Sequence, residues 1–532
     1  MADEARCCAR CRKAQAEVHV REQVYCAGCY ARVFAEKVRF GLEYTRGAIL
    51  QKSVVRPWEQ GLETGDGPAV APAIAIAYSG GLASTVLLHA VSKALSGAHS
   101  AHYLPARAPE MARIDVLYVQ DGAARAKCGL PQYDTEQVRA QALRIAPHAT
   151  FACVDLAACY ADGSVDCVLE RDGKKYLGER AAGDAQQALR SALDTLFPAS
   201  TSRTGVAAAR TRVEDLHKIL MHHLLRTTAM ERGCAALMYA DDAVTSASAL
   251  LEGIANGAGH KLPIARAASQ WWVAEQETLL IVHPLHTILP SELVYYAQTN
   301  ALGPLYCPTP RAGAEKHSIG ALTHSLVASL QDGVSSTVST IAGTGSKLVY
   351  MPDTLWPTSN EIDLDEATDA MHLKQRDAPR IGAKGMSLVA SVQTLPRWDP
   401  SLLPPSCPLC HLPAKRDAAA WRAQRSVTSS RTATQDPLNL TPLHTRLCYT
   451  CLHVLQVPST PTGASSAQMP LPLYVLNAMH RPEHGRQQVR AAQDTAYIPP
   501  EHTPHIPGGR ASHALQPVSR EAMHDAVQAF LL

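Results

Sequence analysis

Four cysteines near the start of the chain have the residue type and spacing of a metal site. The first pair is Cys8-x2-Cys11, and the second, Cys26-x2-Cys29, follows after fourteen residues. Four thiolates at this spacing can converge tetrahedrally on one Zn²⁺, as in a zinc ribbon. Cys7 stands beside Cys8 and could replace it, although the two-residue spacing selects Cys8. Because four protein thiolates leave no position open for water, we predict a structural metal.

A second set of paired cysteines consists of Cys407-x2-Cys410 and Cys448-x2-Cys451, with 37 residues between the pairs. This separation is longer than in a compact ribbon and implies an insertion. Together with Cys7, the two sets contain nine of the 15 cysteines. In an intracellular chain, paired cysteines favour metal over disulfides, so we predict a second zinc site.

The stretch from Ala73 to His89 could bind phosphate. Residues 73–78 are typical of a strand buried on both faces, Ser79-Gly80-Gly81 ends that strand, and a helical period follows behind Ser84. Unpaired N–H groups and the dipole at a helix start favour an anion, and glycines let the backbone approach it. Ser79 and Ser84 could add hydroxyl donors. An ordinary strand-to-helix turn explains the same residues equally well.

Two acidic residues and a glycine turn could also lie near a nucleotide. Asp241 and Asp242 follow a predicted strand, where a carboxylate could reach a nucleotide or its Mg²⁺. We favour helix capping as the role of one of them. The Gly257-x-Gly259 turn could approach a phosphate, which is weak evidence by itself.

Buried-strand patterns alternate with helical patterns through the middle of the chain. We expect strands at 73–78, 114–119, 150–156, 234–240 and 279–285, with helices at 135–145 and 212–232. This alternation predicts an α/β fold with a doubly wound, mostly parallel sheet that binds ligands at the carboxyl ends of its strands. The segment 162–204 is polar and has little periodicity, so we expect a surface excursion there. Cys153 and Cys234 fall in strands and are expected in the core.

Composition divides the chain into five parts. We predict a zinc-ribbon-like module with a linking helix at 1–55, the α/β core at 73–350, a linker or insert at 351–405, a second CxxC module with an insert at 406–456, and a loosely ordered tail with a terminal helix at 457–532.

Charge is unevenly distributed although the formal net charge is only +2. Residues 1–60 contain 11 Lys and Arg against 7 Asp and Glu, and residues 411–446 contain 6 against 2. Such ends suit an anionic partner such as nucleic acid, and ordinary solvated surface accounts for them as well. No apolar run follows Met1, and the apolar stretch 69–78 is shorter than the roughly 20 residues of a bilayer helix. We therefore expect a cytoplasmic protein without a membrane partner.

The loop from Ser79 to Ser84 resembles the PP-loop of ATP pyrophosphatases, which adenylate an atom before displacing AMP. The usual form is Ser-Gly-Gly-x-Asp-Ser, and here Ala83 replaces the aspartate. The loop keeps its phosphate-binding glycines but lacks a carboxylate that active members carry.

The order of the motifs is distinctive: a CxxC pair, SGGxxS, GC-x3-MYADD, a GxG turn, PL-x3-LPSE-x2-YY, CPLC and CYTC. It resembles the cytoplasmic tRNA 2-thiolation protein 2 family. The resemblance implies a heterodimer with a catalytic sister, cytoplasmic tRNA 2-thiolation protein 1. That complex transfers sulfur from a thiocarboxylated ubiquitin-related modifier, which also links it to protein urmylation. The acceptor is the wobble uridine of lysine, glutamine and glutamate tRNAs, which becomes 5-methoxycarbonylmethyl-2-thiouridine.

Zinc is predicted from the cysteine spacing, and the resemblance implies ATP at a degenerate loop. It makes four basic residues of the first module candidates for tRNA contact: Arg6, Arg10, Arg12 and Lys13. Active relatives carry a CxxC shortly before the long helix, whereas residues 202–211 contain no cysteine. With Ala83, this absence predicts an auxiliary, non-catalytic subunit. Two alternatives stay open: an active ATP-dependent tRNA sulfurtransferase, and a PP-loop ligase or amidotransferase acting on a small molecule.

Overall fold

A computed structural model describes much of the 532-residue chain. The described residues are 7–20, 23–50, 73–95, 113–128, 132–170, 174–181, 183–199, 201, 205–274, 277–305, 318–333, 335–346, 348, 406–414, 418, 441–456 and 466–480. Contacts divide the chain into a unit Met1–Pro482 and a unit Glu483–Leu532. The second unit, with the predicted terminal helix, lies outside the described residues, as do the predicted linker at 351–405 and the segment 51–72.

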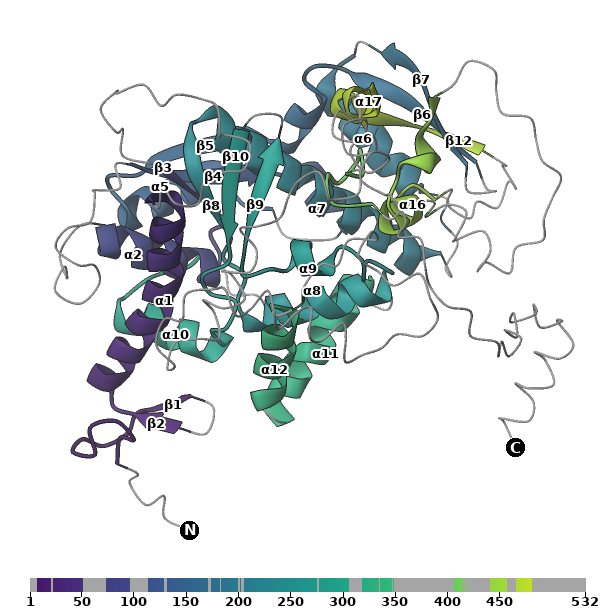
Figure 1. The fold of residues 1–532 in the computed structure, drawn as a ribbon. Coiled ribbons are helices and arrows are strands. Elements are labelled where there is room, and N and C mark those ends of the chain that lie inside the picture. Colours follow the sequence, from purple (N-terminus) through teal and green to yellow (C-terminus); the bar gives the residue numbers. More distant parts are fainter. Residues whose placement is uncertain are drawn as a thin grey trace, which may run out of the picture. The chain divides into compact units, whose positions relative to one another are not determined.

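A six-stranded sheet is the centre of the core (Figure 1), in the order β5-β4-β3-β8-β10-β9. Its strands are β5 Thr150–Asp155, β4 Arg113–Gln120, β3 Ala73–Ala77, β8 Cys234–Met238, β10 Glu277–Val282 and β9 Ser269–Ala274. The first five pair in parallel, and β9 adds an antiparallel edge. The predicted α/β fold with a mostly parallel sheet is confirmed. Strand β9 was not predicted.

Apolar side chains cover both faces of this sheet, which explains the continuous apolar runs. Ile74 and Ile76 of β3 lie in one buried cluster, beneath α1 Ala27–Leu50, α2 Leu82–Leu95, α5 Thr135–Ile145 and α10 Pro290–Thr299. Ala73 and Ala75 face the opposite way and pack beneath α7 Val206–Glu231. Burial on both faces is what a parallel strand requires, and the loop at Ser79 follows directly at the carboxyl end of β3.

A second, antiparallel sheet joins distant parts of the chain, in the order β11-β7-β6-β12. Its strands are β6 Ser164–Glu170, β7 Lys175–Ala181, β11 Thr441–Pro442 and β12 Ser466–Pro472. The expected surface excursion at 162–204 is therefore wrong, because buried Val165, Cys167 and Leu169 alternate along β6 and help form a second core. Helix α6 Ala185–Leu196 packs on the same core.

The expectation of a loosely ordered tail from residue 457 is wrong for residues 466–480. They form β12, which pairs with β6 along all seven of its residues, and helix α17 Leu473–His480. Sequence reasoning missed this pairing because its partner strand lies some 300 positions earlier.

Three further helices pack together: α8 Ala243–Ala255, α11 Ile319–Gly333 and α12 Ser335–Gly345. They share a small apolar cluster around Val327 and Val338. The short helix α4 Gly122–Cys128 belongs to the second core. Among the residues that the structure describes, no helix has both the length and the apolar composition needed to span a bilayer.

Candidate metal centres and phosphate loop

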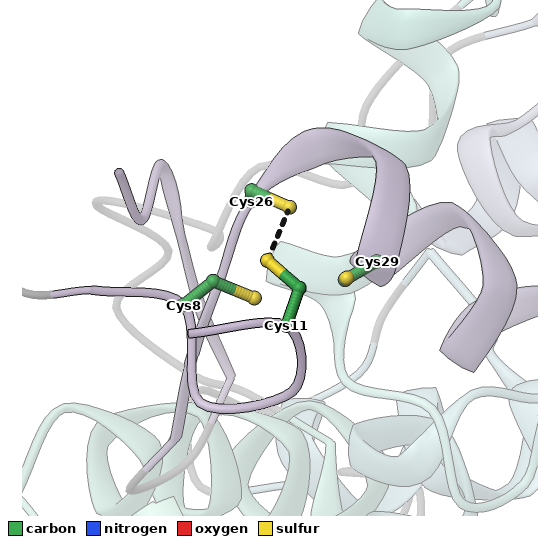
Figure 2. Close-up of side chains that lie close together, drawn as sticks. All are labelled: Cys8, Cys11, Cys26 and Cys29. Atoms are coloured by element: carbon green, nitrogen blue, oxygen red, sulfur yellow. Dashed lines mark hydrogen bonds between the residues drawn. The ribbon is translucent and has the colours of Figure 1, made fainter. Parts of the chain in front are cut away.

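The N-terminal cysteines come together at one end of α1 (Figure 2). Cys8 and Cys11 lie in the loop before the hairpin of β1 Val18–Val20 and β2 Gln23–Tyr25, while Cys26 precedes α1 and Cys29 lies in its first turn. All four sulfur atoms lie within 4.8 Å of one another, and Cys11 Sγ is 3.9 Å from Cys26 Sγ. A tetrahedral Zn²⁺ with Zn–S bonds of about 2.3 Å requires sulfur atoms about 3.8 Å apart, so the site fits this ion.

Backbone groups around Cys8 shape its loop and favour the thiolate form of its side chain. Arg12 N–H donates to the carbonyl of Cys8, and Arg12 has a left-handed φ of 54°, which turns the loop sharply after Cys11. Backbone N–H groups, that of Cys11 foremost, lower the pKa of the Cys8 thiol to about 6. The thiolate is the form that binds metal. Cys7 is exposed and is not among the four clustered cysteines, so the geometry favours Cys8, as the spacing does.

The α1 helix fastens this module to the core. Lys37 forms an ion pair with Glu292, whose side chain is fully buried, and Tyr30 Oη donates to the Glu292 carbonyl. Phe34 stacks on Tyr296 with ring centroids 4.2 Å apart, and Tyr30 meets Tyr295 edge-on at 5.0 Å. Residues of the LPSE-x2-YY motif therefore pack against α1 and hold it on the core.

The C-terminal cysteines form a second cluster of the same kind. Cys407, Cys410, Cys448 and Cys451 have all four sulfur atoms within 4.8 Å, and Cys410 Sγ lies 3.8 Å from Cys448 Sγ. This spacing again suits a tetrahedral ion. All four are buried, and Cys448 precedes helix α16 Tyr449–Val454. In both clusters one pair of cysteines lies in a turn and the other pair lies at the start of a helix. The C-terminal cluster is buried, whereas the N-terminal cluster is partly open to water.

The phosphate-loop candidate is a tight turn between β3 and α2. Gly80 has a φ of 81°, which favours glycine, and a side chain there would come within 3.0 Å of Leu305. Ser84 is buried and donates to the Gly81 carbonyl over 3.0 Å, so its hydroxyl closes the turn. Ser79 is exposed, and its hydroxyl lies 3.2 Å from that of Ser84. Of the two predicted hydroxyl donors, Ser79 is the one open to solvent.

A cavity of about 400 Å³ lies at the carboxyl ends of the neighbouring strands β4 and β5. Polar side chains lining it are Gln120, Asp121, Gln132, Asp155, Gln186 and Arg190. Asp121 Oδ2 is 2.8 Å from His217 Nε2. Sequence reasoning missed this cavity, although an Asp-Gly pair directly after a strand is a signal that could have indicated it. Ligands bind at this edge in open α/β sheets.

Three of the four remaining nucleotide candidates have identified contacts within the chain. Asp242 accepts a hydrogen bond from Thr245 N–H at 2.7 Å and caps α8, the role favoured for one of the two aspartates. Asp241 is 3.1 Å from His283 Nδ1; burial raises the pKa of this partly buried carboxyl, but the histidine and Arg266 together lower it below its usual value. Gly257, at a φ of 69°, lies against the ring of Tyr449 beside the C-terminal cluster. Gly259 has open space around it.

Three thiols outside the two clusters have raised pKa values. Burial raises the pKa of Cys159 and Cys167 to about 12 and that of Cys234 to about 11. Cys234 is buried, as predicted, whereas Cys153 is exposed, so its expected core position is wrong. Strand β5 is at the edge of the sheet, which leaves some of its side chains uncovered.

The basic candidates of the first module differ in availability. Arg10 forms a 2.9 Å ion pair with Glu36 of α1. Arg12 and Lys13 are exposed, and Arg6 lies outside the described residues.

The fold and this edge of the sheet define a class: an α/β protein with a mostly parallel sheet, in which a Ser-Gly-Gly turn connects the central strand β3 to the start of α2. Within that class, the family model described as cytoplasmic tRNA 2-thiolation protein 2 matches residues 318–453, which include all four cysteines of the C-terminal cluster. The resemblance predicted from the motifs is confirmed: the chain is similar to this family over residues 318–453.

Individual relatives carry the same name. The chain is 23% identical over 378 residues to cytoplasmic tRNA 2-thiolation protein 2 of Bos taurus, covering 65% of this chain and 68% of that one. It is 23% identical over 406 residues to protein 2-A of Xenopus laevis, covering 68% and 70%. Among solved structures, the U34-tRNA thiolase NcsA from Methanococcus maripaludis with its 4Fe-4S cluster has a TM-score of 0.39 at 14% identity, covering 67% of this chain and 93% of that one. An NAD⁺ synthetase from Burkholderia pseudomallei has a TM-score of 0.29 at 13% identity, covering 59% and 88%.

Proposed function

We propose that this chain is the auxiliary subunit of a cytoplasmic tRNA 2-thiolation complex. With a catalytic sister, cytoplasmic tRNA 2-thiolation protein 1, it helps to transfer sulfur from a thiocarboxylated ubiquitin-related modifier to the wobble uridine of lysine, glutamine and glutamate tRNAs. The observation that carries the proposal is the likeness, over about two thirds of the chain, to relatives named for cytoplasmic tRNA 2-thiolation.

Two features support an auxiliary role. Ala83 occupies the loop position where active PP-loop enzymes carry aspartate. The buried core thiols Cys159, Cys167 and Cys234 have raised pKa values, so each holds a small fraction of the thiolate that a sulfur-transfer nucleophile needs. Both features weaken the alternative in which this chain thiolates tRNA by itself.

The metal sites have a structural role in this proposal. Zn²⁺ bound by four thiolates supplies folding energy and no reactive water. The N-terminal module has only short strands and one helix, so its loop at Cys8 and Cys11 depends on the metal for its shape. We assign ATP contact to Ser79, Gly80 and Gly81 of the phosphate loop and to the polar cavity at the carboxyl ends of β4 and β5.

We assign tRNA contact to the exposed cations of the first module. Arg12 and Lys13 project from the cysteine loop, where phosphate could approach them. Phosphate contacts of this kind position a nucleic acid without reading its sequence. Base selection therefore belongs elsewhere in the complex.

The test is 2-thiolation of an unmodified lysine tRNA by this chain, by its sister and by the pair, each with ATP and the thiocarboxylated modifier. Thiouridine is measured by mass spectrometry of the digested tRNA. We expect product from the pair, little from the sister and none from this chain. Product from this chain alone would mean that it is an active sulfurtransferase, whereas ATP turnover with a small molecule and no tRNA would indicate a PP-loop ligase.

A further inference from the structure

A lysine of the α/β core reaches into the C-terminal cysteine cluster. Lys261 Nζ lies 3.3 Å from Cys448 Sγ and 3.7 Å from Cys410 Sγ, and the residue is 7% exposed. It comes from the turn before the short helix α9 Leu262–Ala265, more than 140 positions from either cysteine. A lysine is rarely buried this far unless it is paired.

The electrostatics of a metal site explain this lysine. Four thiolates and one divalent ion carry a net charge of −2, which is costly to bury without compensation. Lys261 supplies one positive charge, and its ammonium can donate N–H···S hydrogen bonds to two of the four sulfur atoms. Neutral thiols would supply no negative charge, which would leave the carboxyl of Asp215 as a nearby acidic group that interacts with Lys261. The two contacts from the ammonium to sulfur therefore match an ionised cluster, as it is when metal is bound.

Neighbouring contacts fix the lysine on the cluster. Gly257 has no side chain to separate its turn from the ring of Tyr449, which lies one residue after Cys448. His260 Nε2 is 3.1 Å from the carbonyl of Pro413, on the other cysteine turn. Lys261 N–H donates to the carbonyl of Ala258, which shapes the turn. The core segment 257–261 thus forms one wall of the cluster.

We propose that Lys261 is the charge-compensating partner of a metal ion bound by Cys407, Cys410, Cys448 and Cys451, and that it couples metal binding there to the α/β core. This inference rests on the metal occupancy put forward under the proposed function. It does not extend to the N-terminal cluster, where Cys11, Cys26 and Cys29 are only partly buried and water can stabilise the charge.

The experiment uses the full chain with Cys8→Ser and Cys11→Ser, so that only the C-terminal cluster holds zinc. Zinc content is measured by mass spectrometry, and affinity by competition with a chromophoric chelator. Lys261→Met removes the charge and the donors at similar volume, Lys261→Gln keeps a donor without charge, and Lys261→Arg keeps the charge.

We expect zinc affinity to fall about tenfold or more in Lys261→Met and Lys261→Gln, in the range typical of lost partners around metal ligands, and to fall much less in Lys261→Arg. In the metal-free chain we compare stability toward urea. There, Lys261→Met should be at least as stable as the lysine chain, because it buries no ammonium beside neutral thiols. This contrast separates a charge role from a packing role.

Unchanged zinc affinity in a folded Lys261→Met chain would overturn the inference, and so would equal losses in Lys261→Met and Lys261→Arg. If Lys261→Met does not fold, the comparison of Lys261→Gln with Lys261→Arg decides in the same way. A background chain that folds but takes up no zinc would instead show that the proposed metal occupancy is wrong, and this inference would fall with it.

Discussion

The backbone N–H of Leu305 donates a 3.0 Å hydrogen bond to the carbonyl of Gly80 and holds the segment after α10 against the phosphate loop. Gln141 links the same parts, since its side chain contacts both Tyr78 Oη and the carbonyl of Gly303. The loop is therefore fixed from a distant part of the chain. Because the loop is held in this way, a substitution that disfavours the conformation of Gly80 should lower the stability of the chain.

Gly80→Ala should destabilise the chain by about 1–2 kcal/mol, because an L-residue resists a left-handed backbone. The φ of 81° is the main cause, since the Leu305 side chain can move away from the new methyl group. Urea unfolding followed by circular dichroism measures the change. Gly259→Ala is the matched control, with no atom within 4 Å of the added carbon. Equal stability of the two variants would contradict this account of the loop.

Cys8→Ser should remove metal from the N-terminal cluster, whereas Cys7→Ser should leave it bound. Cys8 Sγ is one of the four clustered sulfur atoms, and the exposed Cys7 is not. Metal content of each purified variant checks this, with about one zinc per chain lost in the first and none in the second. Loss of metal in the Cys7 variant alone would assign the ligand to the neighbouring residue.

Lys37→Met should cost more stability than Glu292→Gln. Removing the lysine leaves a fully buried carboxylate without its cation, at a cost of about 2 kcal/mol or more. The glutamine keeps an oxygen for the Leu289 N–H, and Lys37, with 27% of its side chain exposed, can reach water. We therefore expect Glu292→Gln to lower the free energy of unfolding by about 1 kcal/mol. Urea unfolding of both variants and of the double variant tests the order, and the double variant should be more stable than Lys37→Met.

Acid should destabilise the chain partly through His286. Burial lowers the pKa of this imidazole from 6.5 to about 4, so the unfolded chain takes up the proton first as the pH falls. The stability from His286 is present above pH 6.5 and is lost down to about pH 4, by about 3 kcal/mol in total. His286→Asn can keep the bond from the Nδ1 position to the His283 carbonyl. Between pH 6.5 and 4, the unfolding free energy of His286→Asn should fall less steeply with decreasing pH than that of the unaltered chain. Equal slopes for the two proteins would exclude this role of His286.

Arg12→Glu with Lys13→Glu should weaken tRNA binding by the reconstituted pair and lower its dependence on salt, because two phosphate contacts are lost. Fluorescence anisotropy with labelled tRNA at several salt concentrations measures both quantities. Arg10→Glu is a poorer probe, since it also breaks the pair with Glu36. If affinity and salt slope stay unchanged in the double variant, tRNA contacts lie elsewhere.

Short-range sequence patterns predicted those features that depend only on residues close together in the chain. Apolar runs predicted five of the strands in the central sheet, and interior strands such as β3 and β8 are apolar because they are buried on both faces. The CxxC spacing indicated which cysteines would meet, since each pair lies within a single turn of backbone. The preference for Cys8 over Cys7 has the same origin.

Contacts between distant residues could not be predicted in this way. Strand β6 looked like part of a polar insertion because its partner β12 lies far along the chain, and only the pairing of the two creates the core that buries Val165 and Cys167. Cys153 looked like a core residue because a sequence does not reveal which strand is at the edge of a sheet.

The sequence by itself determined the α/β class, the two sets of clustered cysteines and the family resemblance, because each depends on short-range spacing or on motif order. The tertiary structure alone decided that Lys261 lies on the C-terminal cluster and that Leu305 lies on Gly80. Such contacts arise when separate segments bury their apolar faces together, and the free energy of that burial depends on all the segments at once.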